Sequence, residues 1–169
     1  MKNIALTGFM GTGKSAVGRN LAKRLGYTYI DVDQEIERSK GMKVTDIFKT
    51  YGEEVFRDLE SEALARVTKL TRVVIATGGG AVLRQENIDR LKEGCIIVCL
   101  KASPETILSR VKGNKDRPLL DTEDPLTRIK DLLRQREPNY KMADFTIETD
   151  GLSPTEVVEH IMNNIQNYR

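Results

Sequence analysis

Short strand-like runs and amphipathic segments alternate along the chain. The runs fall at 4–6, 28–33, 73–76, 96–100 and 145–147, and are apolar or alternating as in buried strands. Between them, apolar residues recur every three or four positions, which is typical of amphipathic helices. Strands that alternate with helices at this spacing form parallel βαβ units with helices on both faces of the sheet. The pattern predicts an α/β fold, a three-layer α/β/α sandwich around a five-stranded parallel sheet.

Glycines and cap-plus-proline pairs mark the expected helix boundaries. Gly26 should end the first helix, and Gly52 interrupts a helical pattern that runs from about 44 to 70. Serine or aspartate followed by proline begins a helix at Ser103-Pro104, Asp124-Pro125 and Ser153-Pro154. We expect the last helix to reach about Asn167. The segment at 112–124 is charged and weakly patterned, which makes it a candidate lid.

The segment after the first strand, Gly8-Phe9-Met10-Gly11-Thr12-Gly13-Lys14-Ser15, fits the phosphate-loop pattern G-x-x-x-x-G-K-[ST]. Its glycines allow successive N–H groups to converge on an anion, and the following helix adds its positive dipole end. We expect Lys14 to reach the β- and γ-phosphates of a nucleotide and the Ser15 hydroxyl to ligate Mg²⁺. The remaining nucleotide contacts are predicted at Gly11, Thr12, Gly13 and Ala16. A glycine-rich turn that matches by chance is the alternative, and the flanking strand and helix argue against it.

Asp31 and Asp33 stand two residues apart at the end of the second predicted strand. In an extended chain both carboxylates would point to one side of the sheet. A phosphate-loop nucleotide brings a cation and a hydroxyl that such carboxylates can bind, so we predict Asp31 in the Mg²⁺ shell, through water. Asp33 would accept a hydrogen bond from the acceptor hydroxyl and is a candidate base. The alternative is that both aspartates cap the following helix.

Three arginines and a glycine triplet are further candidates. Arg57 lies off the apolar stripe of its helix with Glu60 one turn later, and the pattern alone favours a solvated ion pair. In the other interpretation, Glu60 fixes the guanidinium so that Arg57 can hold an anionic acceptor. Arg117 lies in the candidate lid, where it would bring charge to a migrating phosphoryl group, and Arg136 is an ordinary surface arginine by default. The triplet Gly78 to Gly80 brings backbone close to some other group.

Composition narrows the classes of function. The 169 residues fit a single domain, and the net charge of +2, from 27 Lys and Arg against 25 Asp and Glu, does not indicate a nucleic-acid or membrane partner. No apolar run approaches the roughly 20 residues of a bilayer span. The first strand begins at once, leaving no room for a signal peptide, so we expect a cytoplasmic protein.

Cysteine and histidine offer no catalytic cluster. Cys95 and Cys99 share one face of a predicted strand at a separation of roughly 13 Å, which is too far for a disulfide. We interpret both as small buried hydrophobic residues. The only histidine, His160, lies on a C-terminal amphipathic helix, so histidine-dependent triads and metal clusters are excluded.

The order and spacing of these motifs resemble the shikimate kinase family over nearly the whole chain. The similarity rests on the phosphate loop, Asp31-Val32-Asp33, Phe56-Arg57-Asp58-Leu59-Glu60, Thr77-Gly78-Gly79-Gly80, Arg117-Pro118-Leu119-Leu120, and Arg136 with Tyr140. The resemblance implies a P-loop fold of the nucleoside-monophosphate-kinase-like group with a mobile lid. It also implies transfer of the γ-phosphoryl group of ATP to the 3-hydroxyl of shikimate, a step of chorismate and aromatic amino-acid biosynthesis.

The resemblance implies roles for individual residues. Lys14, Asp33 and Arg117 would be catalytic, and Ser15 and Asp31 would bind Mg²⁺. Shikimate would be bound by Asp33, Arg57, Gly78, Gly79, Gly80 and Arg136. Arg110 would flank the adenine, and Arg117 would also lie near the nucleotide. The third strand ends in Ala76-Thr77 and has no acidic Walker-B residue. The resemblance implies that this is normal for the family and that Asp31 takes the metal role. We expect one kinase domain over 1–169, monomeric, with ATP and shikimate as its partners.

Two other functions stay open on the sequence alone. A related small-molecule kinase, for gluconate for instance, would share the loop and the fold but would lack this combination of motifs. A non-catalytic nucleotide-dependent switch would need no acceptor pocket, and Asp33, Arg57 and Arg136 would then be surface residues without a ligand. Release of ADP that depends on an acceptor would separate these alternatives.

Overall fold

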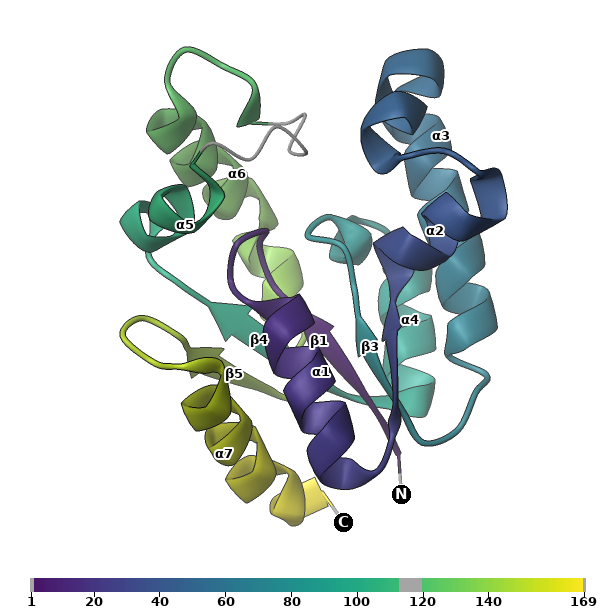
Figure 1. The fold of residues 1–169 in the computed structure, drawn as a ribbon, viewed down its shortest axis with the longest axis vertical. Coiled ribbons are helices and arrows are strands. Elements are labelled where there is room, and N and C mark those ends of the chain that lie inside the picture. The colour runs from purple at the N-terminus through teal and green to yellow at the C-terminus, as the bar shows by residue number, and fades with distance from the viewer. Residues whose placement is uncertain (1, 113–119, 169) are drawn as a thin grey trace.

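Five parallel strands form one sheet in the computed structural model, which describes residues 2–112 and 120–168 (Figure 1). The strand order is β2-β3-β1-β4-β5, and every neighbouring pair is parallel. The strands are β1 Asn3–Thr7, β2 Thr28–Asp31, β3 Val73–Ala76, β4 Cys95–Lys101 and β5 Phe145–Glu148. The predicted α/β fold with a five-stranded parallel sheet is confirmed.

Helices cover both faces of this sheet. On one face lie α1 Lys14–Leu25 and α7 Pro154–Ile165. On the other lie α2 Val32–Lys40, α3 Val44–Val67 and α4 Gln85–Gly94. Beyond the carboxyl ends of β1 and β4 lie α5 Pro104–Val111 and α6 Pro125–Tyr140, and the short 3₁₀ helices are η1 Ala81–Leu83 and η3 Gln166–Tyr168. In Figure 1, α5 and α6 stand on one side of the carboxyl edge of the sheet and α2 and α3 on the other.

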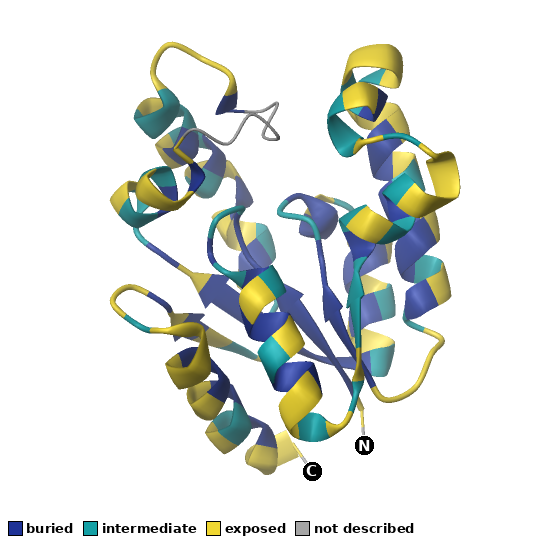
Figure 2. Ribbon diagram, in the orientation of Figure 1, coloured by how far each residue is buried: buried dark blue, intermediate teal, exposed yellow. Residues whose placement is uncertain are grey.

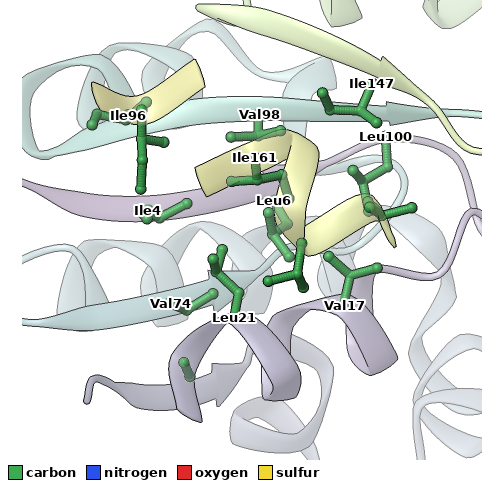
Figure 3. Packing of buried hydrophobic residues seen from close by; sticks show 14 residues of the cluster. Ile4, Leu6, Val17, Leu21, Val74, Ile96, Val98, Leu100, Ile147 and Ile161 are labelled. Atoms are coloured by element: carbon green, nitrogen blue, oxygen red, sulfur yellow. The ribbon is translucent and has the colours of Figure 1, made fainter. Parts of the chain in front are cut away.

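The alternation of side chains along the strands divides the core into two layers. Ile4 and Leu6 of β1 pack with Leu21 of α1 and Ile161 of α7 (Figure 3), whereas Ala5 between them faces the α2–α4 layer. Central strands are therefore buried on both faces, and exposed residues follow the outer sides of the helices (Figure 2). This packing fixes the carboxyl edge of the sheet, where the phosphate loop leaves β1.

Local signals placed most helix boundaries. The side chains of Ser103, Asp124 and Ser153 each accept a hydrogen bond from the backbone N–H three residues later, so the three predicted caps are confirmed. Gly26 ends α1 with φ of 66°, and Gly52 breaks α3 with φ of 85°. The last α-helix ends at residue 165 rather than near Asn167, because its final turn tightens into η3.

Cys95 and Cys99 are both free and buried on the same side of β4, as predicted. Burial raises the pKa of the Cys95 thiol to about 12, so it stays protonated at neutral pH. Both residues thus act as small hydrophobic side chains. Among the helices that the structure describes, none combines the length and the apolar character needed to cross a membrane.

Candidate functional site

The phosphate loop closes around the side chain of Lys14. The Lys14 ammonium donates to the carbonyl oxygens of Gly8 at 2.6 Å and Phe9 at 2.8 Å, and the Thr12 hydroxyl braces the loop by donating to Phe9 at 2.7 Å. The loop glycines at 8, 11 and 13 all have positive φ, which lets the amides turn inward. A cavity of about 350 Å³ lies over the loop and is lined by Gly11, Gly13, Lys14, Ser15 and Ala16, among others.

Asp31 lies beside Ser15, but the predicted strand geometry is wrong. The strand ends at Asp31, and Asp33 is in the first turn of α2 rather than in an extended chain. The reason is local: Asp31 Oδ1 accepts a hydrogen bond from Gln34 N at 3.2 Å and so caps the helix. The capping alternative therefore holds for Asp31, yet its other oxygen, Oδ2, remains available to the Ser15 hydroxyl at 3.3 Å.

Tyr29 is a second hydroxyl on the Asp31 carboxylate. Its phenolic oxygen lies 3.2 Å from Asp31 Oδ2, and its ring is held between Gly18 of α1 and the guanidinium of Arg19. Burial raises the pKa of Tyr29 to about 12, so the hydroxyl stays protonated and donates. Alternation along β2 puts Tyr29 and Asp31 on one side of the strand, so the signal for this pairing is present in the sequence.

These oxygens suit a hard divalent cation. A hydroxyl has two lone pairs besides its proton, so Ser15 can ligate a cation while it donates to Asp31. In the described ranges no three His, Cys, Asp or Glu side chains group as a ready metal cage. Mg²⁺ at nucleotide sites needs no such cage, because one or two protein oxygens, phosphate oxygens and waters complete its shell. Ser15 and Asp31 therefore fit the predicted ion.

A second cavity, of about 340 Å³, adjoins the first. It is lined from several elements by Met10, Asp31, Asp33, Gln34, Glu37, Lys43, Val44, Thr45, Phe48, Phe56, Arg57, Glu60, Gly78, Gly79, Gly80 and Arg136. Every residue predicted to bind the acceptor is among them. Asp33, Gly78 and Gly79 line both cavities, so Asp33 stands where the two meet. A group bound in one cavity can thus face a group bound in the other.

Arg57 and Glu60 form a buried pair rather than the solvated one that the pattern favoured. Arg57 is 7 % exposed and Glu60 is 0 % exposed, and Arg57 Nη1 donates to Glu60 Oε1 at 2.9 Å. The ring of Phe56 lies under the guanidinium with its centroid 5.2 Å away. Burial raises the pKa of the Glu60 carboxyl, against the opposing effect of Arg57. The second interpretation, in which Glu60 fixes Arg57, agrees with this geometry.

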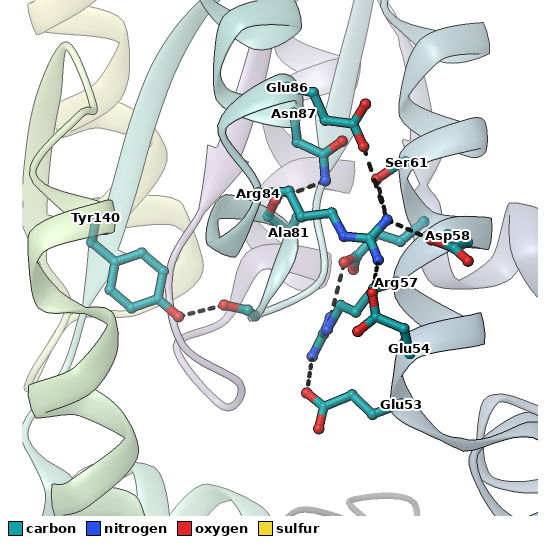
Figure 4. A network of polar contacts seen from close by, with 12 residues as sticks. Glu53, Glu54, Arg57, Asp58, Ser61, Ala81, Arg84, Glu86, Asn87 and Tyr140 are labelled. Carbon is teal, nitrogen blue, oxygen red and sulfur yellow. Dashed lines mark hydrogen bonds and ion pairs between the residues drawn. The ribbon is translucent and has the colours of Figure 1, made fainter.

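The helix that carries Arg57 is anchored to the chain beyond the glycine triplet. Arg84, which follows η1, contacts Asp58 at 2.7 Å and Glu54 at 2.7 Å, both on α3 (Figure 4). Each exposed ion pair contributes little, but two carboxylates of α3 on one guanidinium together hold α3 against the turn. A side chain at Gly80 would collide with the Arg57 guanidinium, which explains the glycine there.

Arg136 enters the same cavity from α6. It is 3 % exposed, and its guanidinium lies over the ring of Phe9 at 5.5 Å from the centroid. Three buried polar atoms of this cavity have no hydrogen-bond partner among the described residues: Arg57 Nε, Glu60 Oε2 and Arg136 Nη1. Unpaired buried donors are costly, and two of these three belong to guanidinium groups. The cavity is therefore built to receive an oxygen-rich anion.

Two arginines, Arg110 and Arg117, were also predicted to lie near the nucleotide. Arg110 of α5 lines the phosphate cavity and donates to the Gly11 carbonyl at 3.2 Å and to Thr149. Arg117 and most of the candidate lid lie outside the described residues. Sequence reasoning missed the wall formed by Lys43, Val44, Thr45 and Phe48, because these residues reach the cavity only through the packing of α3 on α2.

Comparison with known proteins agrees with this geometry. A family model described as "Shikimate kinase" matches residues 10–166. A shikimate kinase from Thermodesulfovibrio yellowstonii is 51 % identical over 166 residues, covering 98 % of this chain and 96 % of that protein. One from Caldanaerobacter subterraneus is 49 % identical over 162 residues, covering 96 % and 95 %.

Solved structures give the same result. A shikimate kinase from Acinetobacter baumannii in complex with shikimate has a TM-score of 0.97 and 39 % identity, covering 100 % of this chain and 95 % of that one. A gluconokinase from Sinorhizobium meliloti shares the fold, with a TM-score of 0.58 at 18 % identity over 99 % of this chain and 93 % of that one. With a family model over most of its length and relatives near 50 % identity, this chain belongs to the shikimate kinase family.

Proposed function

We propose that this chain transfers the γ-phosphoryl group of ATP to the 3-hydroxyl of shikimate, giving shikimate 3-phosphate and ADP. The observation that carries the proposal is the pair of buried arginines, Arg57 and Arg136, in a cavity that meets the phosphate-loop cavity at Asp33. Shikimate has one carboxylate and three hydroxyls, which suits two guanidinium groups and a carboxylate acceptor. Family membership supports the same reaction.

In this mechanism the protein positions two substrates and neutralises charge. Lys14 and the loop amides hold the phosphates, while Arg57 and Arg136 hold the acceptor carboxylate. Asp33 accepts a hydrogen bond from the 3-hydroxyl, whose oxygen forms a bond to the γ-phosphorus as the bond from that phosphorus to the β,γ-bridging oxygen breaks. The hydroxyl proton passes to Asp33, and ADP leaves with the bridging oxygen.

We assign the divalent cation as Mg²⁺, held by the Ser15 hydroxyl and, through water, by Asp31. A cation held there would supply positive charge that neutralises the phosphates. The donor set supports this choice because hydroxyl, carboxylate and phosphate oxygens are all hard ligands. Asp31 would orient the Ser15 lone pairs by accepting a hydrogen bond from the Ser15 hydroxyl at Oδ2.

Replacing Tyr29 by phenylalanine is expected to weaken cation binding by about tenfold, because the change removes a hydroxyl that orients Asp31. Titration of the ADP-bound protein with Mn²⁺, followed by electron paramagnetic resonance, measures the affinity directly. Tyr27→Phe is the matched control: its hydroxyl is buried without a partner in the described part of the chain. Equal Mn²⁺ affinities in the two variants would contradict the role of Tyr29.

The test of the reaction is ADP formation with MgATP and each of three acceptors: shikimate, gluconate and a nucleoside monophosphate. ADP release that depends on shikimate, with phosphate recovered on the 3-hydroxyl, is the expected result. Release that depends on gluconate instead would favour the related small-molecule kinase, whose known structure shares only the fold with this chain. Acceptor-independent ATP hydrolysis with no phosphorylated small molecule would favour a nucleotide-dependent switch.

Further assignments belong to the proposal. Residues 112–124 would form the lid, with Arg117 directed at the transferred phosphoryl group, and Arg110 would flank the adenine. The chain would act as a monomer and one domain, since a single copy supplies both cavities. It would work in the cytoplasm, where ATP is available. Sedimentation analysis at assay concentration tests the monomer.

A further inference from the structure

A tyrosine at the end of α6 contacts the backbone of the acceptor cavity. The Tyr140 hydroxyl donates to the Gly79 carbonyl oxygen at 2.5 Å (Figure 4). Tyr140 is buried together with Phe9 and Leu132, and burial raises its pKa to about 12, so the hydroxyl stays protonated. This hydrogen bond is therefore made in a dry, packed environment and holds the carbonyl firmly.

The direction of one carbonyl fixes the direction of the next amide. Within a trans peptide unit the C=O and N–H bonds point opposite ways, and the peptide between Gly79 and Gly80 is trans. Because Tyr140 draws the carbonyl toward α6, the Gly80 N–H is turned away from α6. In Figure 4, Tyr140 lies on one side of the carbonyl to which it donates, and Arg57 of α3 lies on the other side. Gly80 lines the acceptor cavity against the Arg57 guanidinium.

The Gly80 amide is not used within the turn. The neighbouring amides of Ala81 and Leu83 donate to the carbonyls of Gly78 and Gly80, whereas Gly80 N–H has no backbone acceptor among the described residues. Arg57 cannot serve as an acceptor, because a guanidinium offers only donors. Glu60 Oε2 also forms no hydrogen bond within the described ranges. Two kinds of donor, one amide and one guanidinium, thus face the same space.

We propose that Tyr140 is a positioning residue that aims the Gly80 N–H into the acceptor cavity, where this amide and Arg57 bind oxygen atoms of the acceptor. The proposal deepens the proposed function and rests on it. Helix α6 then contributes to the acceptor cavity in two ways. Arg136 supplies a guanidinium, and Tyr140, four residues later, orients the opposite wall of the cavity. Asn139 of the same turn donates to the Val82 carbonyl at 2.9 Å and holds η1 independently.

The test compares Tyr140→Phe with Tyr27→Phe, which also removes one phenolic hydroxyl. In Tyr140→Phe the Gly79 carbonyl loses its partner and the peptide can rotate. We expect the dissociation constant for shikimate, measured by calorimetry, and the shikimate KM both to rise about tenfold. The KM for ATP and the Mn²⁺ affinity should stay within twofold of the wild type, and Tyr27→Phe should match the wild type throughout.

The outcomes separate this inference from the proposed function. Wild-type protein that shows no shikimate-dependent ADP release would contradict the proposed function, whatever Tyr140 does. Active wild type with an unchanged shikimate KM and dissociation constant in Tyr140→Phe would overturn the inference alone. Equal losses for shikimate and ATP, with a lower melting temperature, would also overturn it, since they indicate a general packing role.

Asn139→Ala provides a second comparison within the same helical turn. It removes the bond to Val82 but leaves the peptide between Gly79 and Gly80 held by Tyr140. A smaller loss of shikimate affinity than in Tyr140→Phe is expected. A loss equal to or larger than that of Tyr140→Phe would mean that anchoring η1, rather than aiming the Gly80 amide, determines acceptor binding, and it would overturn the proposal.

Discussion

Asparagine in place of Asp33 is expected to lower turnover with shikimate by roughly 10²- to 10⁴-fold, while ATP binding stays near that of the wild type. The substitution keeps the size of the side chain but removes the charge that accepts the hydroxyl proton. Asp33 lies where the two cavities meet, between the positions of the two substrates. Loss of its charge should therefore slow the chemical step and leave the phosphate loop intact. Steady-state ADP release gives the turnover number, and calorimetry gives the ATP affinity.

The matched control for this variant is Asp46→Asn. Asp46 also lies in the first turn of a helix, so both changes remove a favourable interaction with the helix dipole. Asp46 is exposed and lines neither cavity. Turnover of Asp33→Asn close to that of Asp46→Asn would remove Asp33 from the chemistry. A parallel fall in ATP affinity would instead mean that Asp33 serves the nucleotide.

Alanine in place of Arg57 is expected to weaken shikimate binding by about a hundredfold or more, since a buried carboxylate would lose a charge-assisted partner. The ATP KM should change little. The same variant leaves Glu60 buried without its cation, so the protein should also lose stability, by at most roughly 3–5 kcal/mol. Calorimetry with shikimate and thermal unfolding measure the two effects separately.

Arg38→Ala is a close control for Arg57→Ala. Arg38 contacts Glu35 at 2.9 Å with the same three-residue spacing as Arg57 and Glu60, in the reverse order, but its side chain is 77 % exposed. Arg57→Lys keeps a cation beside Glu60 and loses the forked geometry, so it separates folding from recognition. If the lysine and alanine variants both bind shikimate like the wild type, Arg57 does not hold the acceptor.

The parts of the site that the sequence predicted are those encoded locally. The phosphate loop, the three helix caps and the break at Gly52 depend on neighbouring residues, and all are present. The predicted strand runs two residues too far, to Asp33, because capping and strand geometry compete at Asp31. Its carboxylate can satisfy both a helix N-terminus and Ser15, which no single local pattern expresses.

The parts that could not be predicted depend on contacts between distant segments. Arg57 looked solvated because its helical position faces away from the apolar stripe. Part of its burial comes from Gly80, which lies far away in the sequence, and Arg136 of α6 lines the same cavity. The contact of Tyr140 with Gly79 joins positions 61 residues apart, so the periodicity of apolar residues does not predict it. The family resemblance implied the role of Arg57 and no contact for Tyr140.

The two cavities draw on different stretches of chain, and this has an evolutionary consequence. The donor side comes mainly from the loop and α1, whereas much of the acceptor wall comes from α2 and α3. Selection for a new acceptor can therefore alter α2 and α3 while the phosphate loop is inherited intact. A chain that lost Arg57 would no longer need glycine at position 80, because the guanidinium that a side chain would meet there would be gone.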